Sequence, residues 1–173
     1  MAEIVQVPGP CEILVGTGST AALEHLGWTV GGAEIEEQVK LAEVFGDQNG
    51  GEEGLPIEWQ HLGCMDVVTL EFSKLDFTVA QKVSQRINPG LSSYGGTIAA
   101  GTSPTPGTLI LATTSYYRLL LNPTNSTFIR NYLIGIPIDP ITSNIGTRFQ
   151  KRLQRWMCFP PVGGGTLWNV TNT

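Results

Sequence analysis

The segment from Ala33 to Leu75 constrains the fold most, because it consists of extended runs interrupted by one polar loop. Apolar and polar residues alternate in Ala33–Phe45, and one face carries Ile35, Val39 and Leu41. Asp66–Leu75 alternates in the same way, and one of its faces carries Val68, Leu70 and Phe72. A period of two is typical of a half-buried strand. The sequence therefore predicts strands here, with residues 55–63 resuming the extended pattern after the loop.

The loop between the first two runs holds no apolar residue, so it cannot join a core. Strands joined by an acidic, glycine-rich tip make a sheet with a protruding loop. That shape suits contact with a neighbouring copy better than it suits catalysis. The predicted contact loop comprises Gly46, Asp47, Gln48, Asn49, Gly50, Gly51, Glu52, Glu53 and Gly54.

The composition favours a single mainly β domain over residues 1–173, either a β-sandwich or a barrel. Charged residues make up 14% of the chain and there are 21 glycines, whereas soluble domains usually carry about 25% charged residues. Few charges indicate a surface that is partly covered, and oligomerisation is one way to cover it. An uncharged, turn-rich domain that stays alone is the simpler alternative.

Charge is distributed unevenly along the chain. Up to Asp76 there are 14 acidic residues and two lysines, whereas from Phe77 onward one acidic residue accompanies eight lysines and arginines. Such asymmetry bears on association rather than on fold. Either copies meet acidic surface to basic surface, as in a ring, or the two halves interleave and neutralise each other within one subunit.

Proline, glycine and helix-capping residues indicate where the remaining elements of the first half begin and end. Residues 1–10 contain two prolines, which have no backbone N–H to donate to a neighbouring strand. We therefore expect an N-terminal arm that forms an edge strand at most. Cys11–Thr17 reads as a strand, and the Gly31-Gly32 pair predicts a hairpin turn before Ala33. We expect Asp76 to be a helix N-cap and Phe77–Ile87 to form the one flanking α-helix, with its apolar stripe packed on the sheet.

The second half contains one long loop, residues 88–107, rich in Gly, Ser, Thr and Pro. Strands are expected at residues 108–114, 116–122 and 127–138, and the first two can also form one long bent strand, because only Ser115 separates them. For residues 146–157 we favour a strand, while a helix with an apolar stripe remains an alternative. The lysines and arginines of this segment suggest a nucleic-acid-binding site. A solvent-exposed face, or a contact with the acidic half of a neighbouring copy, fits better. The candidate contact residues are Arg148, Lys151, Arg152 and Arg155.

The one enzyme-like motif is G-x-G-x-x-A at residues 16–21, after a strand. A dinucleotide site needs a strand, a tight turn and a helix long enough to cross a sheet. Here the candidate helix ends at Gly27, and the next strand is acidic rather than apolar. A glycine-rich connection between strands is the favoured reading, with a small nucleotide-binding enzyme as a remote alternative.

No catalytic, metal or membrane pattern emerges, so we expect no enzyme, no cofactor and no membrane partner. The two histidines, His25 and His61, stand in no motif with a nucleophile. The three cysteines are too far apart for a zinc site, and we expect reduced thiols. No apolar run approaches the roughly 18 residues of a membrane helix, and Met1–Pro10 does not read as a signal peptide.

The order of elements resembles the first half of the tail tube proteins of tailed bacteriophages. The resemblance covers roughly Pro8 to Ile87 and rests on GPCEILVG, LEHLGWTVGGAEI and FGDQNGGEEGLPIEWQHLGCMDVVTLEF, followed by the helix after Asp76. It rests on a strand, a glycine turn, an acidic strand, a D-x-x-G-type loop, a strand and a helix. From Asn88 onward it is weak, and the long segment 88–107 departs from the family.

The resemblance implies a virion protein that forms hexameric rings, stacked into a hollow tube through which DNA passes. The protein would be assembled in the host cytoplasm and reside in the virion tail with other virion proteins. Gly46–Gly54 would then reach the next ring, and the channel wall would carry Glu34, Glu36 and Gln38. A neutral or acidic wall suits DNA that must slide rather than bind. A trimeric capsid decoration protein is the alternative.

Overall fold

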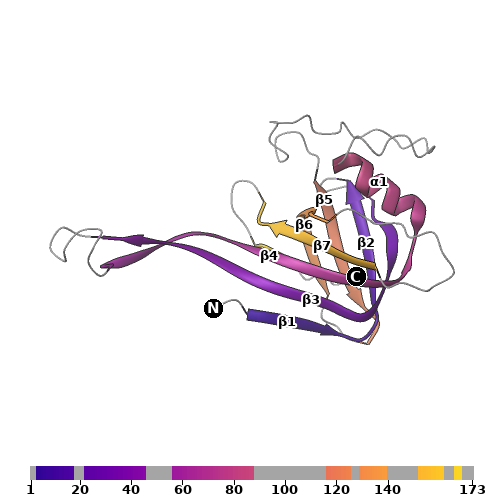
Figure 1. Cartoon of the computed structure of the whole chain (residues 1–173), viewed down its shortest axis with the longest axis horizontal. Coiled ribbons are helices and arrows are strands. Elements are labelled where there is room, and N and C mark those ends of the chain that lie inside the picture. The colour runs from indigo at the N-terminus through magenta and orange to yellow at the C-terminus, as the bar shows by residue number, and fades with distance from the viewer. Residues whose placement is uncertain are drawn as a thin grey trace.

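The computed structural model describes residues 3–17, 22–45, 56–87, 116–125, 129–139, 152–161 and 166–168. These residues form a closed, six-stranded antiparallel barrel with one flanking helix, and a long hairpin projects from it (Figure 1). The mainly β barrel expected from the sequence is confirmed. The elements are β1 (Glu3–Pro8), β2 (Cys11–Thr17), β3 (Glu24–Val44), β4 (Glu58–Leu75), α1 (Phe77–Ile87), β5 (Tyr117–Pro123), β6 (Arg130–Pro137) and β7 (Arg152–Phe159).

The barrel runs in the order β3-β2-β5-β6-β7-β4, and the pairing of β4 with β3 closes it. Every neighbouring pair is antiparallel. β1 lies outside this cycle and pairs with β3 alone, from Glu3 opposite Glu37 to Pro8 opposite Gly32. The N-terminal arm therefore contains an edge strand, which suits a segment that ends in proline.

The hairpin expected at Gly31-Gly32 is wrong, because β3 continues through both glycines as one strand of 21 residues. The register against β4 shifts between Thr29 and Ala33, and Gly32 has a φ of 106°. A glycine with positive φ lets a strand bulge and bend without reversing. The buried Thr29 hydroxyl accepts a hydrogen bond from Cys11 N at 3.0 Å. The bend moves β3 from pairing with β2 to pairing with β1 (Figure 1).

The two extended runs after the polar loop are likewise one strand, β4, which pairs with β3 from Leu75 opposite Gly27 to Glu58 opposite Val44. Its apolar face is confirmed, since Val68, Leu70 and Phe72 are buried. Side chains from all six barrel strands fill the interior, and Trp156 and Tyr132 are the largest of the fully buried ones. The barrel is therefore a packed core and not a channel.

The helix and its cap are where the sequence placed them. Asp76 Oδ1 accepts hydrogen bonds from the backbone N–H groups of Thr78 at 2.9 Å and Val79 at 3.2 Å. Val79, Ala80 and Val83 are buried against the core, so α1 covers one end of the barrel (Figure 1). The apolar stripe predicted for this helix packs as expected at these three positions.

The expected strand near the C-terminus is β7, and the helical alternative is wrong for Arg152–Phe159. Its inward face carries Gln154, Trp156 and Cys158, whereas Leu153 and Arg155 face outward. Beyond β7, Leu167 and Trp168 pack against the core. The strands expected at residues 116–122 and 127–138 are confirmed as β5 and β6. The loop 88–107 and the strand 108–114 lie outside the described residues.

Candidate functional site

The hairpin of β3 and β4 extends well beyond the barrel, and we call residues 38–44 and 58–65 the ribbon. Among the described residues, β1 pairs along β3 only as far as Glu37, and β7 pairs along β4 only as far as Asp66. Beyond the pair formed by Glu37 and Asp66, the two strands of the ribbon are paired only with each other among the described residues (Figure 1). Isolated two-stranded hairpins are marginal in water, and open strand edges template pairing with another chain.

Exposed apolar side chains concentrate on the ribbon. Of the ten large hydrophobic side chains that are exposed in the described part of the chain, five lie on it, and Ile57 directly precedes it. The exposed fractions are 59% for Val39, 51% for Leu41 and 54% for Trp59. Single exposed apolar residues are ordinary on any protein, but a cluster on one projecting element marks an interaction surface.

Three of these exposed residues, Val39, Leu41 and Trp59, continue the inward face of the barrel, whereas Val44 has the opposite parity on β3. Val39 and Leu41 share the parity of the buried Ile35 on β3, and Trp59 lies opposite Glu43, the next residue of that parity. Residues directly opposite each other in an antiparallel pair project from the same face. The ribbon therefore presents a core-like face with no core beneath it. A partner that covered this face would bury Val39, Leu41 and Trp59.

The row predicted for a channel wall lies on the opposite, outward face of β3. Glu34, Glu36 and Gln38 are not among the buried residues, and Gln38 Nε2 donates a hydrogen bond to Glu36 Oε1 at 2.9 Å. Glu34 and Glu36 lie between β1 and β4, and Glu36 is opposite Ile4 and Val67. Gln38 is paired with β4 alone among the described strands, opposite Met65. The row therefore faces away from the interior of the barrel.

The other predicted contact residues divide between described and undescribed parts. The loop Gly46–Gly54 and the cations Arg148 and Lys151 lie outside the described residues. Arg152 opens β7, opposite Phe72. Arg155 is already paired within its own chain, since its Nε and Nη2 lie 2.8 and 2.9 Å from the carboxylate oxygens of Asp139. That pair holds the pKa of Asp139 below its usual range, chiefly through the hydrogen bond from Arg155.

A buried charge cluster at the base of the ribbon was missed by the sequence reasoning. Asp66 and Arg130 are 0% and 3% exposed. Asp66 Oδ2 accepts a hydrogen bond from the Tyr132 hydroxyl at 2.7 Å and one from Arg130 Nη1 at 3.3 Å. Arg130 Nη1 also lies 2.9 Å from Oε1 of the half-buried Glu37. Strand parity was the available signal, because Asp66 shares its face with Val68, and Arg130 shares its face with Tyr132.

Burial dominates the electrostatics of this cluster. Desolvation raises the pKa of Asp66 above 3.8, although the hydrogen bond from Tyr132 opposes the shift. Desolvation also raises the pKa of the Tyr132 hydroxyl, so it stays a donor. The ring of Trp168 lies 4.5 Å from the guanidinium carbon of Arg130, a cation–π distance. The C-terminal segment thereby covers the cluster at the ribbon end of the barrel.

The two charge halves of the sequence do interleave at specific points within one subunit. Arg130 contacts Glu37 and Asp66, and Lys82 Nζ lies 2.8 Å from Glu24 Oε2. Each pair joins a cation of the basic half to an acid of the acidic half. This supports the interleaving alternative for these residues.

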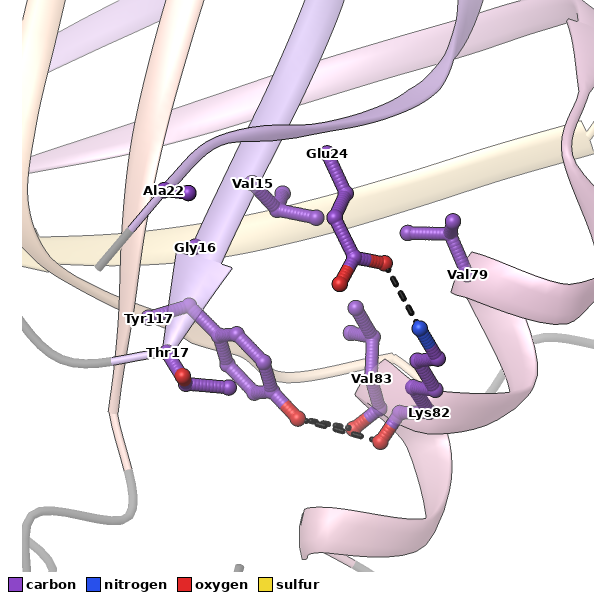
Figure 2. Close-up of a pocket in the computed structure, with 9 residues that line it drawn as sticks. All are labelled: Val15, Gly16, Thr17, Ala22, Glu24, Val79, Lys82, Val83 and Tyr117. Atoms are coloured by element: carbon purple, nitrogen blue, oxygen red, sulfur yellow. Dashed lines mark hydrogen bonds and ion pairs between the residues drawn. The ribbon is translucent and has the colours of Figure 1, made fainter. Parts of the chain in front are cut away.

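A small hollow lies where α1 meets β2 and β5, next to the glycine-rich motif (Figure 2). The Glu24–Lys82 ion pair borders it, and the Tyr117 hydroxyl donates to the carbonyl oxygens of Lys82 and Val83. Its volume of about 50 Å³ compares with the roughly 300 Å³ or more of a ligand pocket. β2 and β3 are also antiparallel neighbours, whereas a dinucleotide unit needs parallel strands.

The described residues offer few other groups that could bind a metal ion or act as a nucleophile. No group of three His, Cys, Asp or Glu residues there is arranged to hold a metal ion. Cys11 and Cys158 are buried free thiols, and burial raises the pKa of Cys11 to about 12, which disfavours the reactive thiolate. Within this part of the chain no helix is both long and apolar enough to cross a membrane.

Comparison with protein-family models, with curated proteins and with solved structures found no match for this chain.

Proposed function

We propose that this chain is a structural protein of a tailed bacteriophage virion that self-assembles into stacked, hexameric rings. The rings form the tail tube, which conducts DNA. Its partners are further copies of itself and other virion proteins, and DNA is only transiting cargo. The work of such a subunit is assembly, so no catalytic residue and no cofactor are required.

The observation that carries the proposal is the ribbon. It exposes an apolar face with Val39, Leu41 and Trp59, and no described strand pairs with either of its outer edges. At about 25 cal/mol per Å² of apolar surface, covering such a face contributes several kcal/mol. A second copy supplies the matching chemistry at high local concentration, because every subunit brings a ribbon and a barrel.

The packed barrel supports a channel between copies. Trp156 and Tyr132 occupy the interior, so DNA cannot pass through a single subunit. The outward row of Glu34, Glu36 and Gln38 lies beside the ribbon's base, where several copies can place it around a common axis. A neutral or acidic lining repels phosphates and lets DNA slide.

A projecting ribbon that docks on a different surface of the next copy makes a heterologous contact. Heterologous contacts generate rings when the rotation closes and filaments when it does not. In stacked rings, the contact between subunits of one ring closes, and the contact between successive rings repeats without closing. The ribbon therefore suits a tube better than an isolated pair of subunits.

The test is electron microscopy of the purified protein together with sedimentation. We expect the unmodified chain to form rings or tubes, and we expect Leu41→Asp to abolish them, because it places a charge on the apolar face. The matched control is Gln60→Asp, which adds the same charge to an exposed polar position on the opposite face of the ribbon.

Gln60→Asp should assemble like the unmodified chain. Trimers that bind empty shells would instead identify a capsid decoration protein. A chain that stays monomeric at high concentration under all buffer conditions would exclude both structural roles. Saturable nucleotide binding that Gly18→Val abolishes would favour the enzyme alternative.

A further inference from the structure

A second exposed apolar surface lies on the outward face of β4, β7 and β6, and we call it the outer patch. It comprises Val67 on β4, Leu153 and Met157 on β7, and Ile136 and Ile138 at the end of β6. Four large hydrophobic side chains of the described residues are exposed elsewhere than on the ribbon or directly before it. Two of the four lie on the outer patch, since Leu153 is 59% and Ile138 is 42% exposed.

The strand register joins the residues of the outer patch into one surface. Val67 lies opposite Met157, and Met157 lies opposite Ile136. Residues directly opposite each other in an antiparallel pair project from the same face, so these three side chains form a row across three strands. The backbone N–H of Ile138 donates a hydrogen bond to the carbonyl oxygen of Arg155 at 2.9 Å, which extends the ladder between β6 and β7 by one further row.

The one cation within the outer patch, Arg155, is compatible with a covered surface. Its guanidinium is paired with the carboxylate of Asp139 through contacts of 2.8 and 2.9 Å. A partner that covers the patch therefore leaves no unpaired charge, which is the costly case for a buried ion. Arginine is also enriched at protein interfaces, unlike lysine.

The outer patch and the apolar face of the ribbon match in length. The ribbon contributes residues 38–44 of β3, and the outward column of β7 spans residues 153–159. Each run is about 20 Å long at about 3.4 Å per residue. Two apolar sheet faces pack against each other by interdigitating their side chains, so each surface can cover the other along its whole length.

The two surfaces lie on opposite faces of the sheet that contains β4. The ribbon continues the inward face with Val39 and Leu41, whereas the outer patch belongs to the outward face. Opposite faces meet when one copy is shifted relative to the next, and such a heterologous contact repeats without closing. The ribbon projects away from its own barrel (Figure 1), so the patch that it can cover belongs to another copy.

We propose that the outer patch is the docking surface for the ribbon of a second copy, which lays its face with Val39, Leu41 and Trp59 over the patch. The inference rests on the proposed function, because it names the surface that receives the ribbon. The contact joins two sheet faces and does not use the strand edges. Each subunit therefore has one donor surface, the ribbon, and one acceptor surface, the outer patch.

The experiment mixes two chains that are each defective on one side. Leu41→Asp disables the ribbon, and Leu153→Asp disables the outer patch at an exposed position that leaves the core intact. We expect each variant alone to sediment as a monomer. A mixture in equal amounts should form a pair of twice the mass that does not grow, because only one intact ribbon meets one intact patch. The control Phe77→Asp adds the same charge to an apolar, 51% exposed position on α1 and should assemble like the unmodified chain.

Cross-linking supplies a second measurement that adds no charge. Leu41→Cys and Leu153→Cys are made in separate chains, both with Cys64→Ser, while the other two native thiols are buried. A short bismaleimide should join the two chains in a mixture, and it should not join Leu41→Cys to the control Phe77→Cys.

The inference is overturned if the unmodified chain assembles while the mixture of aspartate variants stays monomeric or grows beyond the pair. Tubes formed by Leu153→Asp alone, or equal cross-linking to the patch and to the control, also overturn it. The proposed function fails by a different result, namely that the unmodified chain forms neither rings nor tubes, so the two failures are distinguishable.

Discussion

At the scale of residues, Asp66 and Asp139 show how one side chain type takes opposite roles. Asp66 is fully buried at the base of the ribbon, and desolvation raises its pKa. Asp139 is partly exposed, and the hydrogen bonds from Arg155 lower its pKa. The first carboxylate is costly when ionised, and the second is stabilised when ionised.

The two aspartates should therefore affect the pH dependence of unfolding with opposite sign. Relative to Asp66→Asn, the unmodified chain should lose stability as the pH rises through the raised pKa. Relative to Asp139→Asn, it should lose stability as the pH falls through the lowered pKa. Urea unfolding between about pH 3 and pH 7 measures both differences. Parallel pH profiles for the two variants would contradict these shifts.

Residue parity was readable in advance, but partners across the fold were not. The alternation in Asp66–Leu75 placed Val68, Leu70 and Phe72 on one face, and all three are buried. The same parity put Asp66 on that face, and only the barrel closure brings Arg130 to it. Sequence spacing cannot reveal a contact between residues 64 positions apart.

At the scale of elements, the sequence predicted correctly those features that depend on residues close together in the chain. The Asp76 cap and the apolar stripe of Phe77–Ile87 depend on residues two to four positions apart, and α1 has these bounds. Gly31-Gly32 failed as a turn signal because glycine permits a bulge as readily as a reversal. Here β3 continues instead of reversing, because β1 and β4 pair along its two edges.

Deletion of residues 49–53 tests the contact loop at the scale of its hairpin. The loop Gly46–Gly54 has no apolar residue, so the core does not need it, and we expect unchanged thermal unfolding. We also expect polymerisation to be blocked, because the deletion shortens the segment that we propose as the contact with the next copy. Tube length in electron micrographs is the measurement, and tubes of unchanged length would count against the loop's role. A five-residue deletion within 88–107 is the matched control for length.

At the scale of the whole molecule, the question is which force joins the copies. The uneven charge of the sequence suggested contact of acidic and basic surfaces. Within the described residues, however, the cations Arg130, Lys82 and Arg155 already have acidic partners in their own chain. Charges that are neutralised within one subunit attract a neighbour only weakly. The exposed face with Val39 and Leu41 lacks such partners, so apolar burial is the stronger candidate for assembly.

Temperature and salt should separate the two forces. Apolar burial near room temperature is driven by entropy and weakens on cooling. Charge attraction between exposed groups is instead screened by salt, with a Debye length of about 10 Å at 0.1 M. We expect the critical concentration for assembly to rise on cooling from about 37 °C to about 5 °C and to change little between about 50 and 300 mM NaCl, because the contact that we propose for the ribbon is apolar. Turbidity and sedimentation measure it. A critical concentration that rises steeply with salt and ignores cooling would mean that the charge asymmetry, and not the ribbon's apolar face, holds the copies together.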